Sequence, residues 1–150
     1  MRKDSPHILI IDARFYEDIS DELVKGATEA LDAAGSTYER ISVPGVLEIP
    51  PALAIAMEAM DEGTIDFDGV VVLGCVIRGE TSHYDIAAGE SARGVMQIAI
   101  DEGLAVGNGI LTVETREQAW VRAGTIDRNK GAVAVNAALA LCKLRKDLEL

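Results

Sequence analysis

A histidine follows a turn that contains glycine and threonine, directly after an apolar run. Residues 69–77 read GVVVLGCVI, and the turn Arg78-Gly79-Glu80-Thr81-Ser82 separates them from His83. An apolar run of this length is typical of a parallel strand buried on both faces, and a helical pattern begins at about His83. Backbone N–H groups at the start of a helix can bind an anion, and an imidazole can move protons near neutral pH. The sequence therefore predicts an anion site beside a proton carrier.

Each of these signals also has a purely structural explanation. Many helices begin with a glycine and a capping serine, and a histidine on a first helical turn can simply be solvated. Because the turn and His83 occur together after a buried strand, a functional site is the better interpretation.

Two further candidates follow other predicted strands. Phe15 lies in a polar loop after the run HILIID, where an aromatic ring serves either as core filler or as a stacking platform. Glu48, in the segment VLEI, either complements the start of a helix or accepts hydrogen bonds from a polyol or heterocycle. Ligands of parallel α/β sheets bind beyond the carboxyl ends of the strands. We therefore expect Phe15, Glu48, Thr81 and His83 to share one site.

Strand-like and helix-like segments alternate along the chain, as judged from the spacing of apolar residues and from Gly and Pro. The predicted strands are residues 7–12, 37–43, 69–77 and 105–113, and the predicted helices are residues 19–34, 50–62, 83–103, 116–122 and 132–146. We further expect an extended segment at 46–49, a polar loop at 123–131, and a capping box formed by Ser82 and Asp85.

This alternation predicts a three-layer, doubly wound α/β fold, in which a four-stranded parallel sheet carries helices on both faces. The helix predicted from His83 is rich in small residues on several faces. It is expected to pack on the sheet with one side and on another helix or another subunit with the other.

Composition limits the classes of function. The 150 residues fit one domain, and a net charge of -11 argues against nucleic-acid binding. No apolar run is long enough to span a membrane or to serve as a secretory signal, so we expect a cytoplasmic protein. Cys75 and Cys142 match no metal-ligand spacing and are expected to be reduced core thiols. Arg122 and Lys130 have no evident partner, and single surface cations are usually solvated.

Six motifs in order resemble the lumazine synthase family. They are ARF at 13–15, VPGVLEIP at 43–50, GCVIRGETSHYD at 74–85, NGILTVE at 108–114, EQAWVRAGT at 117–125 and NKG at 129–131. The resemblance covers residues 7–146 and implies one flavodoxin-like domain over residues 1–150. It implies a transferase of riboflavin biosynthesis that condenses a ribitylamino-uracil with dihydroxybutanone phosphate, releases phosphate and water, and uses no metal or organic cofactor.

The resemblance also implies roles for individual residues. Phe15 would stack on the uracil ring, and the segment Val46-Leu47-Glu48 would bind the ribityl chain, with Val76 and Ile77 as further substrate contacts. Gly79, Glu80 and Thr81 would hold phosphate, and His83 would move protons. The family forms pentamers with sites between subunits, so that Arg122, Asn108 and Lys130 would reach the site from a neighbouring subunit, Arg122 to the phosphate.

Some positions depart from the usual family pattern. Tyr16 stands where many members have a small polar residue, and Leu47 and Asn108 stand where some have Phe. Glu80 places a carboxylate beside the phosphate turn, which suggests that backbone N–H groups make the contacts there. The segment Ile126-Asp127-Arg128 differs from that of members that build sixty-subunit shells and favours a free pentamer.

Two alternatives remain from the sequence. One is a catalytically weakened paralogue or a scaffold that binds a flavin or lumazine. The other is a non-catalytic flavodoxin-like module, either a flavin carrier or a signalling receiver. It is disfavoured because a receiver needs an acidic residue at the end of its central strand, where the chain has Cys75-Val76. A flavodoxin needs a Ser/Thr-rich loop after its first strand, where the chain has ARFYED.

Overall fold

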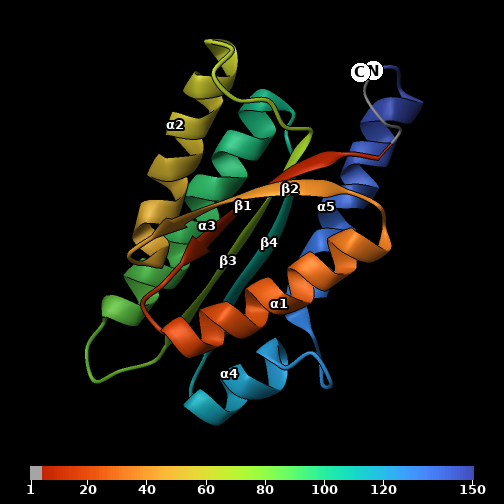
Figure 1. The fold of residues 1–150 in the computed structure, drawn as a ribbon. Coiled ribbons are helices and arrows are strands. Elements are labelled where there is room, and N and C mark those ends of the chain that lie inside the picture. Colours follow the sequence, from red (N-terminus) through yellow and green to blue (C-terminus); the bar gives the residue numbers. More distant parts are fainter. Residues whose placement is uncertain (1–4) are drawn as a thin grey trace.

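The computed structural model describes residues 5–150, which form one parallel sheet between layers of helices (Figure 1). The strands are β1 (His7–Ala13), β2 (Thr37–Val43), β3 (Gly69–Ile77) and β4 (Ala105–Val113). Their order in the sheet is β2-β1-β3-β4, and every neighbouring pair is parallel. The predicted strands and the doubly wound α/β class are thereby confirmed.

The helices divide between the two faces of the sheet. The helix α2 (Ile49–Asp61) packs beside α3 (His83–Glu102) on one face, and α1 (Glu17–Ala33) packs beside α5 (Lys130–Asp147) on the other, as Figure 1 shows. The short helix α4 (Arg116–Ala123) follows β4 on the α1 side. The helix α4 includes Ala123 and α5 begins at Lys130, so the loop spans residues 124–129 and is three residues shorter than the predicted loop 123–131.

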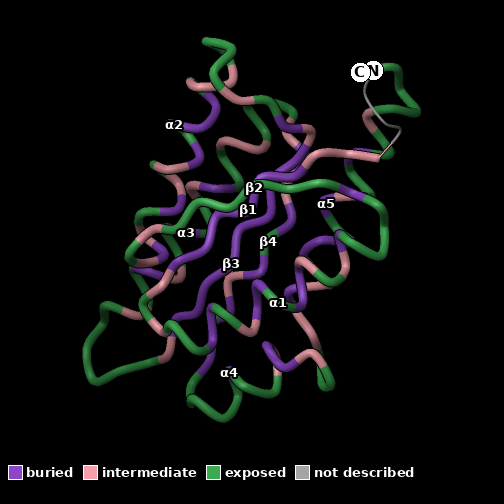
Figure 2. Tube along the Cα trace, in the orientation of Figure 1, coloured by how far each residue is buried: buried purple, intermediate pink, exposed green. Residues whose placement is uncertain are grey.

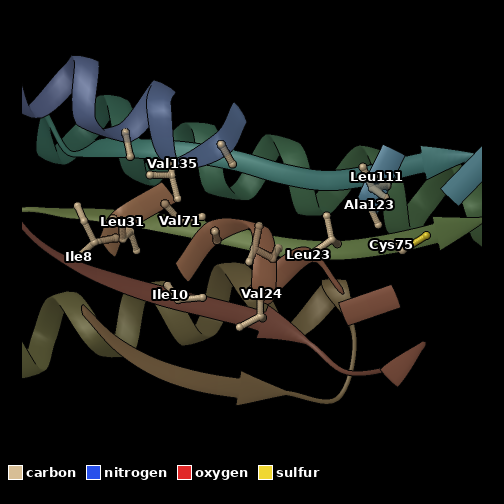
Figure 3. Close-up of a cluster of buried hydrophobic side chains, with 14 of the residues drawn as sticks. Ile8, Ile10, Leu23, Val24, Leu31, Val71, Cys75, Leu111, Ala123 and Val135 are labelled. Carbon is tan, nitrogen blue, oxygen red and sulfur yellow. The ribbon is translucent and has the colours of Figure 1, made fainter. Parts of the chain in front are cut away.

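The central strands carry the core. Residues 70–76 of β3 are all buried, and β1 is buried from Ile8 onward (Figure 2). Side chains such as Ile8, Ile10 and Val71 meet α1 and α5 on one face (Figure 3), and Ile11, Val70 and Val72 meet α2 and α3 on the other. This double burial explains why the strands lack an apolar/polar alternation. Both cysteines are free and buried in this core, as expected.

Two local predictions were wrong. Val46–Glu48 form a short 3-10 helix, η1, that runs directly into α2, and are not extended. A segment of four residues carries too little periodicity to separate these two conformations. Ser82 precedes α3 without a side-chain capping bond, so the expected capping box is absent. By contrast, Thr115 and Gln118 do form a capping box at the start of α4.

A buried carboxylate joins β1 to β2 and α1. The Asp12 side chain is fully buried and accepts hydrogen bonds from Arg40 Nε at 2.9 Å and Arg40 Nη2 at 2.8 Å. Ser42 Oγ donates at 2.7 Å and Ser20 Oγ at 2.9 Å. Burial alone would raise the pKa of Asp12, but these donors and the Arg40 charge outweigh it and lower the pKa to about 2. The ionised form is therefore the one that the fold stabilises.

Substituting Asp12→Asn is expected to lower the free energy of unfolding by about 2 kcal/mol at neutral pH. The folded pKa lies below the unfolded value, so this stabilisation is complete above about pH 4 and is lost as the pH falls toward 2. Urea unfolding at several pH values and one protein concentration tests this, with Asp147→Asn, an exposed partner of Lys143 on α5, as control. Parallel pH dependence in the wild type and Asp12→Asn would contradict it.

Candidate active site

A hollow of about 410 Å³ lies at the carboxyl ends of the strands, where the chain leaves β1, β2 and β3. Four segments line it: the end of β1 and its loop, the β2–α2 connection, the end of β3, and the start of α3. The structure places nine of the predicted site residues on its wall. They are Phe15, Val46, Leu47, Glu48, Val76, Ile77, Gly79, Thr81 and His83.

The β2–α2 connection approaches the sheet closely because Gly74 lacks a side chain. A Cβ atom on Gly74 would lie 2.8 Å from Cγ1 of Val46 and 3.2 Å from Cβ of Ala13. Val46 is buried against β3 as a result, whereas Glu48 stays exposed at the rim of the hollow. The wall at this point offers an apolar side chain, backbone groups of a short helix, and one carboxylate.

Phe15 is the most exposed aromatic ring of residues 5–150, at 73%. Its ring meets that of Tyr16 edge to face, with centroids 4.9 Å apart and planes at 80°. Tyr16 is itself packed against the core, so it supports Phe15 from one side. An exposed ring held on one edge leaves its face free to stack on a planar ligand.

The turn between β3 and α3 leaves the sheet as an exposed loop (Figures 1 and 2). Open space surrounds the Cα of Gly79, and Thr81 Oγ1 accepts a hydrogen bond from the His83 backbone N–H at 3.3 Å. His83 is exposed on the first turn of the twenty-residue helix α3. The turn thus presents a hydroxyl, backbone donors at a helix N-terminus and an imidazole to the same hollow, an arrangement suited to an anion.

Cys75 lies on the wall of the hollow, so its thiol is a candidate nucleophile. Burial raises the pKa of its thiol to about 12, and the charge of Arg116 offsets only part of this effect. A thiol with this pKa stays protonated at neutral pH and is not a nucleophile. The hollow therefore supports acid–base chemistry and binding, without covalent catalysis by Cys75.

Four predicted site residues lie outside the hollow of their own chain: Glu80, Asn108, Arg122 and Lys130. Glu80 is exposed in the turn. Asn108 is exposed on β4, where its side chain accepts from the Ile110 backbone N–H at 2.8 Å. Arg122 is half-buried at the end of α4, where Nη1 donates to the Gln118 carbonyl at 3.1 Å, and Lys130 is the first residue of α5.

Within residues 5–150, no three His, Cys, Asp or Glu side chains are grouped so as to hold a metal ion. None of the helices in that range is both long and apolar enough to cross a membrane.

The model of the 6,7-dimethyl-8-ribityllumazine synthase family matches residues 5–146 of the chain. The chain belongs to this family. A relative from Rhizobium meliloti (strain 1021), 6,7-dimethyl-8-ribityllumazine synthase 1, is 55% identical over 149 residues, which span 99% of this chain and 97% of the relative. The synthase of Agrobacterium fabrum is 52% identical, over 95% of this chain and 97% of the relative. The synthase of Bartonella tribocorum is 54% identical, over 97% of this chain and 93% of the relative.

Membership of the lumazine synthase family confirms the resemblance read from the six motifs, and with it a transferase of riboflavin biosynthesis. Sequence reasoning did not assign site positions to Tyr16, Cys75 and Tyr84, which also line the hollow. The sequence held a signal for all three, since each is adjacent to a residue that was predicted to be in the site.

Proposed function

We propose that the chain condenses 5-amino-6-ribitylamino-uracil with 3,4-dihydroxy-2-butanone 4-phosphate to give 6,7-dimethyl-8-ribityllumazine, phosphate and water. The supporting observation is that one hollow collects an exposed aromatic face, a carboxylate, and an anion-binding turn next to an imidazole. Residues 1–150 would act as a single domain, in the cytoplasm and without a cofactor.

The pyrimidine would occupy the side of the hollow formed by Phe15 and the β2–α2 connection. Its ring stacks on Phe15, and Val76 and Ile77 at the end of β3 contact its edge. The ribityl hydroxyls donate to Glu48 and meet the backbone around Val46 and Leu47. This assignment is supported by the exposure of Phe15 and by the position of Glu48 on the same wall.

The phosphate would bind at the turn, to the backbone N–H groups of Gly79 and Glu80 and to the Thr81 hydroxyl. The 5-amino group of the pyrimidine attacks the ketone and forms an imine with loss of water, after which phosphate leaves by elimination. The ribitylamino nitrogen then attacks the remaining carbonyl carbon, and loss of a second water closes the ring. His83 carries protons between these steps, a contribution that is typically worth roughly 10²–10⁴-fold in rate. Holding two substrates in one hollow supplies much of the remaining acceleration.

The site would be completed by a neighbouring subunit in a homopentamer. Arg122 of that neighbour would bind the phosphate through its planar fork of donors, with Asn108 and Lys130 beside it. Support comes from β4, an edge strand on which Asn108 and Thr112 are exposed in alternation with buried residues. One face of this strand is thus available to a partner.

An apolar stripe on α3 would form part of the subunit interface. Ile86, Met96 and Ile100 recur at helical spacing and are exposed by 54%, 59% and 69%. Gly89, between them, has open space around it. Exposed apolar side chains on one helix face, together with a small residue that permits close approach, indicate contact with another copy of the chain.

Met96→Glu is expected to shift the assembly toward smaller species, because a carboxylate buried at an interface is costly unless it is paired. Mass photometry at several protein concentrations measures the shift. Thr64→Glu adds the same charge in the exposed turn that follows α2, outside α3, and serves as a control. An unchanged assembly in Met96→Glu would exclude this stripe from the interface.

The activity itself is tested by mixing both substrates with the pure protein and following lumazine fluorescence. Product formation at a rate proportional to protein concentration is expected. Tight binding of lumazine or flavin without turnover would instead identify a weakened paralogue or a binding scaffold.

A further inference from the structure

Arg78 is the cation nearest to the proposed phosphate turn in sequence, and its side chain is already engaged. Nε donates to Glu114 Oε2 at 2.8 Å and to Oε1 at 3.1 Å. Glu114 follows β4 directly, so this pair links the end of β3 to the end of β4. The backbone repeats the link, since the Arg78 N–H donates to the Val113 carbonyl at 2.9 Å.

The same guanidinium also contacts the start of α3. Its central carbon lies 4.1 Å from the centroid of the Tyr84 ring, and Nη1 lies 3.6 Å from Asp85 Oδ1. These two residues directly follow His83. Ser82 makes no side-chain capping bond to the first turn of α3. The contacts of Arg78 with Tyr84 and Asp85 therefore hold the start of the helix in place, as a capping bond otherwise would.

We propose that Arg78 is a positioning residue that clamps the turn 79–82 and the start of α3 onto the end of β4, and that it does not bind the phosphate itself. Glu114 is its anchor in this arrangement. The proposal rests on the phosphate role given above to the turn. Arg78 would hold the turn in place. The phosphate contacts would come from the backbone donors, Thr81 and the neighbour's Arg122.

Glu114→Gln tests the proposal, because direct binding and clamping predict opposite changes in phosphate affinity. If Arg78 bound phosphate directly, Glu114→Gln would free its guanidinium, remove a nearby negative charge and tighten phosphate binding. If Arg78 instead acts as a clamp, Glu114→Gln releases the turn and weakens phosphate binding, although a negative charge has been removed.

The experiment measures inorganic phosphate binding by calorimetry and the KM for each substrate, on the assembled protein. Arg78→Gln and Glu114→Gln are each expected to raise the Kd for phosphate roughly fivefold, since several weak exposed contacts are lost together. The KM for the phosphate substrate rises in parallel and the KM for the pyrimidine does not change. The double variant is no weaker than either single variant, because both substitutions break the same link.

Arg78→Lys separates charge from shape. It keeps the positive charge but loses the planar fork, so it is expected to bind phosphate as weakly as Arg78→Gln. The control variants are Lys143→Gln and Asp147→Asn, which break an exposed ion pair on α5 at 2.7 Å and should leave phosphate binding unchanged.

Tighter phosphate binding in Glu114→Gln, or full rescue by Arg78→Lys, would overturn the clamp. Wild-type phosphate affinity in both Arg78→Gln and Glu114→Gln would also overturn the clamp, but it would leave the phosphate role of the turn intact. A wild-type protein that binds no phosphate would instead refute the turn as the phosphate site, and the clamp with it. Glu114→Gln decides the question even where Arg78→Gln fails to fold.

Discussion

Replacing His83 with alanine is expected to lower kcat by roughly 10²–10⁴-fold, the usual contribution of a positioned acid–base group. Imine formation and phosphate loss both require proton transfers, and His83 is the imidazole on the wall of the hollow. Its side chain is exposed, and its backbone N–H donates to Thr81 Oγ1. Folding and assembly should therefore survive the substitution.

The chain offers a matched control in its other histidine, His7. His7 is the first residue of β1, whereas the hollow lies at the carboxyl ends of the strands. His7 bonds Thr37 Oγ1 at 2.7 Å and Glu39 Oε2 at 3.1 Å, away from the hollow. His7→Ala should keep a normal kcat. Initial rates of lumazine formation and melting curves are compared for both variants. Near-normal turnover in His83→Ala would remove this residue from the mechanism.

Arg122→Ala is expected to raise the KM for the butanone phosphate roughly thirtyfold, equivalent to about 2 kcal/mol, the lower end of what losing one partner of a buried charge pair costs. The KM for the pyrimidine should stay the same, because the two substrates occupy different sides of the hollow. Steady-state kinetics with each substrate varied in turn provides the measurement. Arg128→Ala, an exposed cation in the following loop, is the control.

Mixing two impaired variants tests whether Arg122 acts between subunits, with the butanone phosphate held far below the KM of Arg122→Ala so that each variant alone has little activity. Arg122→Ala chains supply His83, and His83→Ala chains supply Arg122. In a mixed ring formed by unfolding and refolding equal amounts, roughly a quarter of the sites would contain both residues if each site is shared by two neighbours. Activity should therefore reappear on mixing. Equal loss of affinity for both substrates, or no recovery in the mixture, would contradict the assignment.

Particular residues show how far the sequence could be interpreted. The apolar run 69–77 predicted β3 with its bounds, because a strand buried on both faces has a pattern that few other structures share. The helices predicted at 50–62 and 83–103 end next to Gly63 and at Gly103, and both glycines adopt positive φ, at 77° and 58°. Segment 46–49 was assigned wrongly, because its conformation depends on the close approach to Gly74, a contact between residues far apart in the chain.

The sequence alone determined the family, the parallel α/β class and the residue types needed for the chemistry. These follow from local periodicity and from motifs, which are properties of neighbouring residues. The tertiary structure decided which of those residues meet. It brought Phe15, Glu48, Thr81 and His83 to one hollow and left Asn108, Arg122 and Lys130 outside it. It also paired Arg78 with Glu114 and buried Asp12 among its donors. Distances between residues that are remote in sequence depend on strand order and register, which no local pattern specifies.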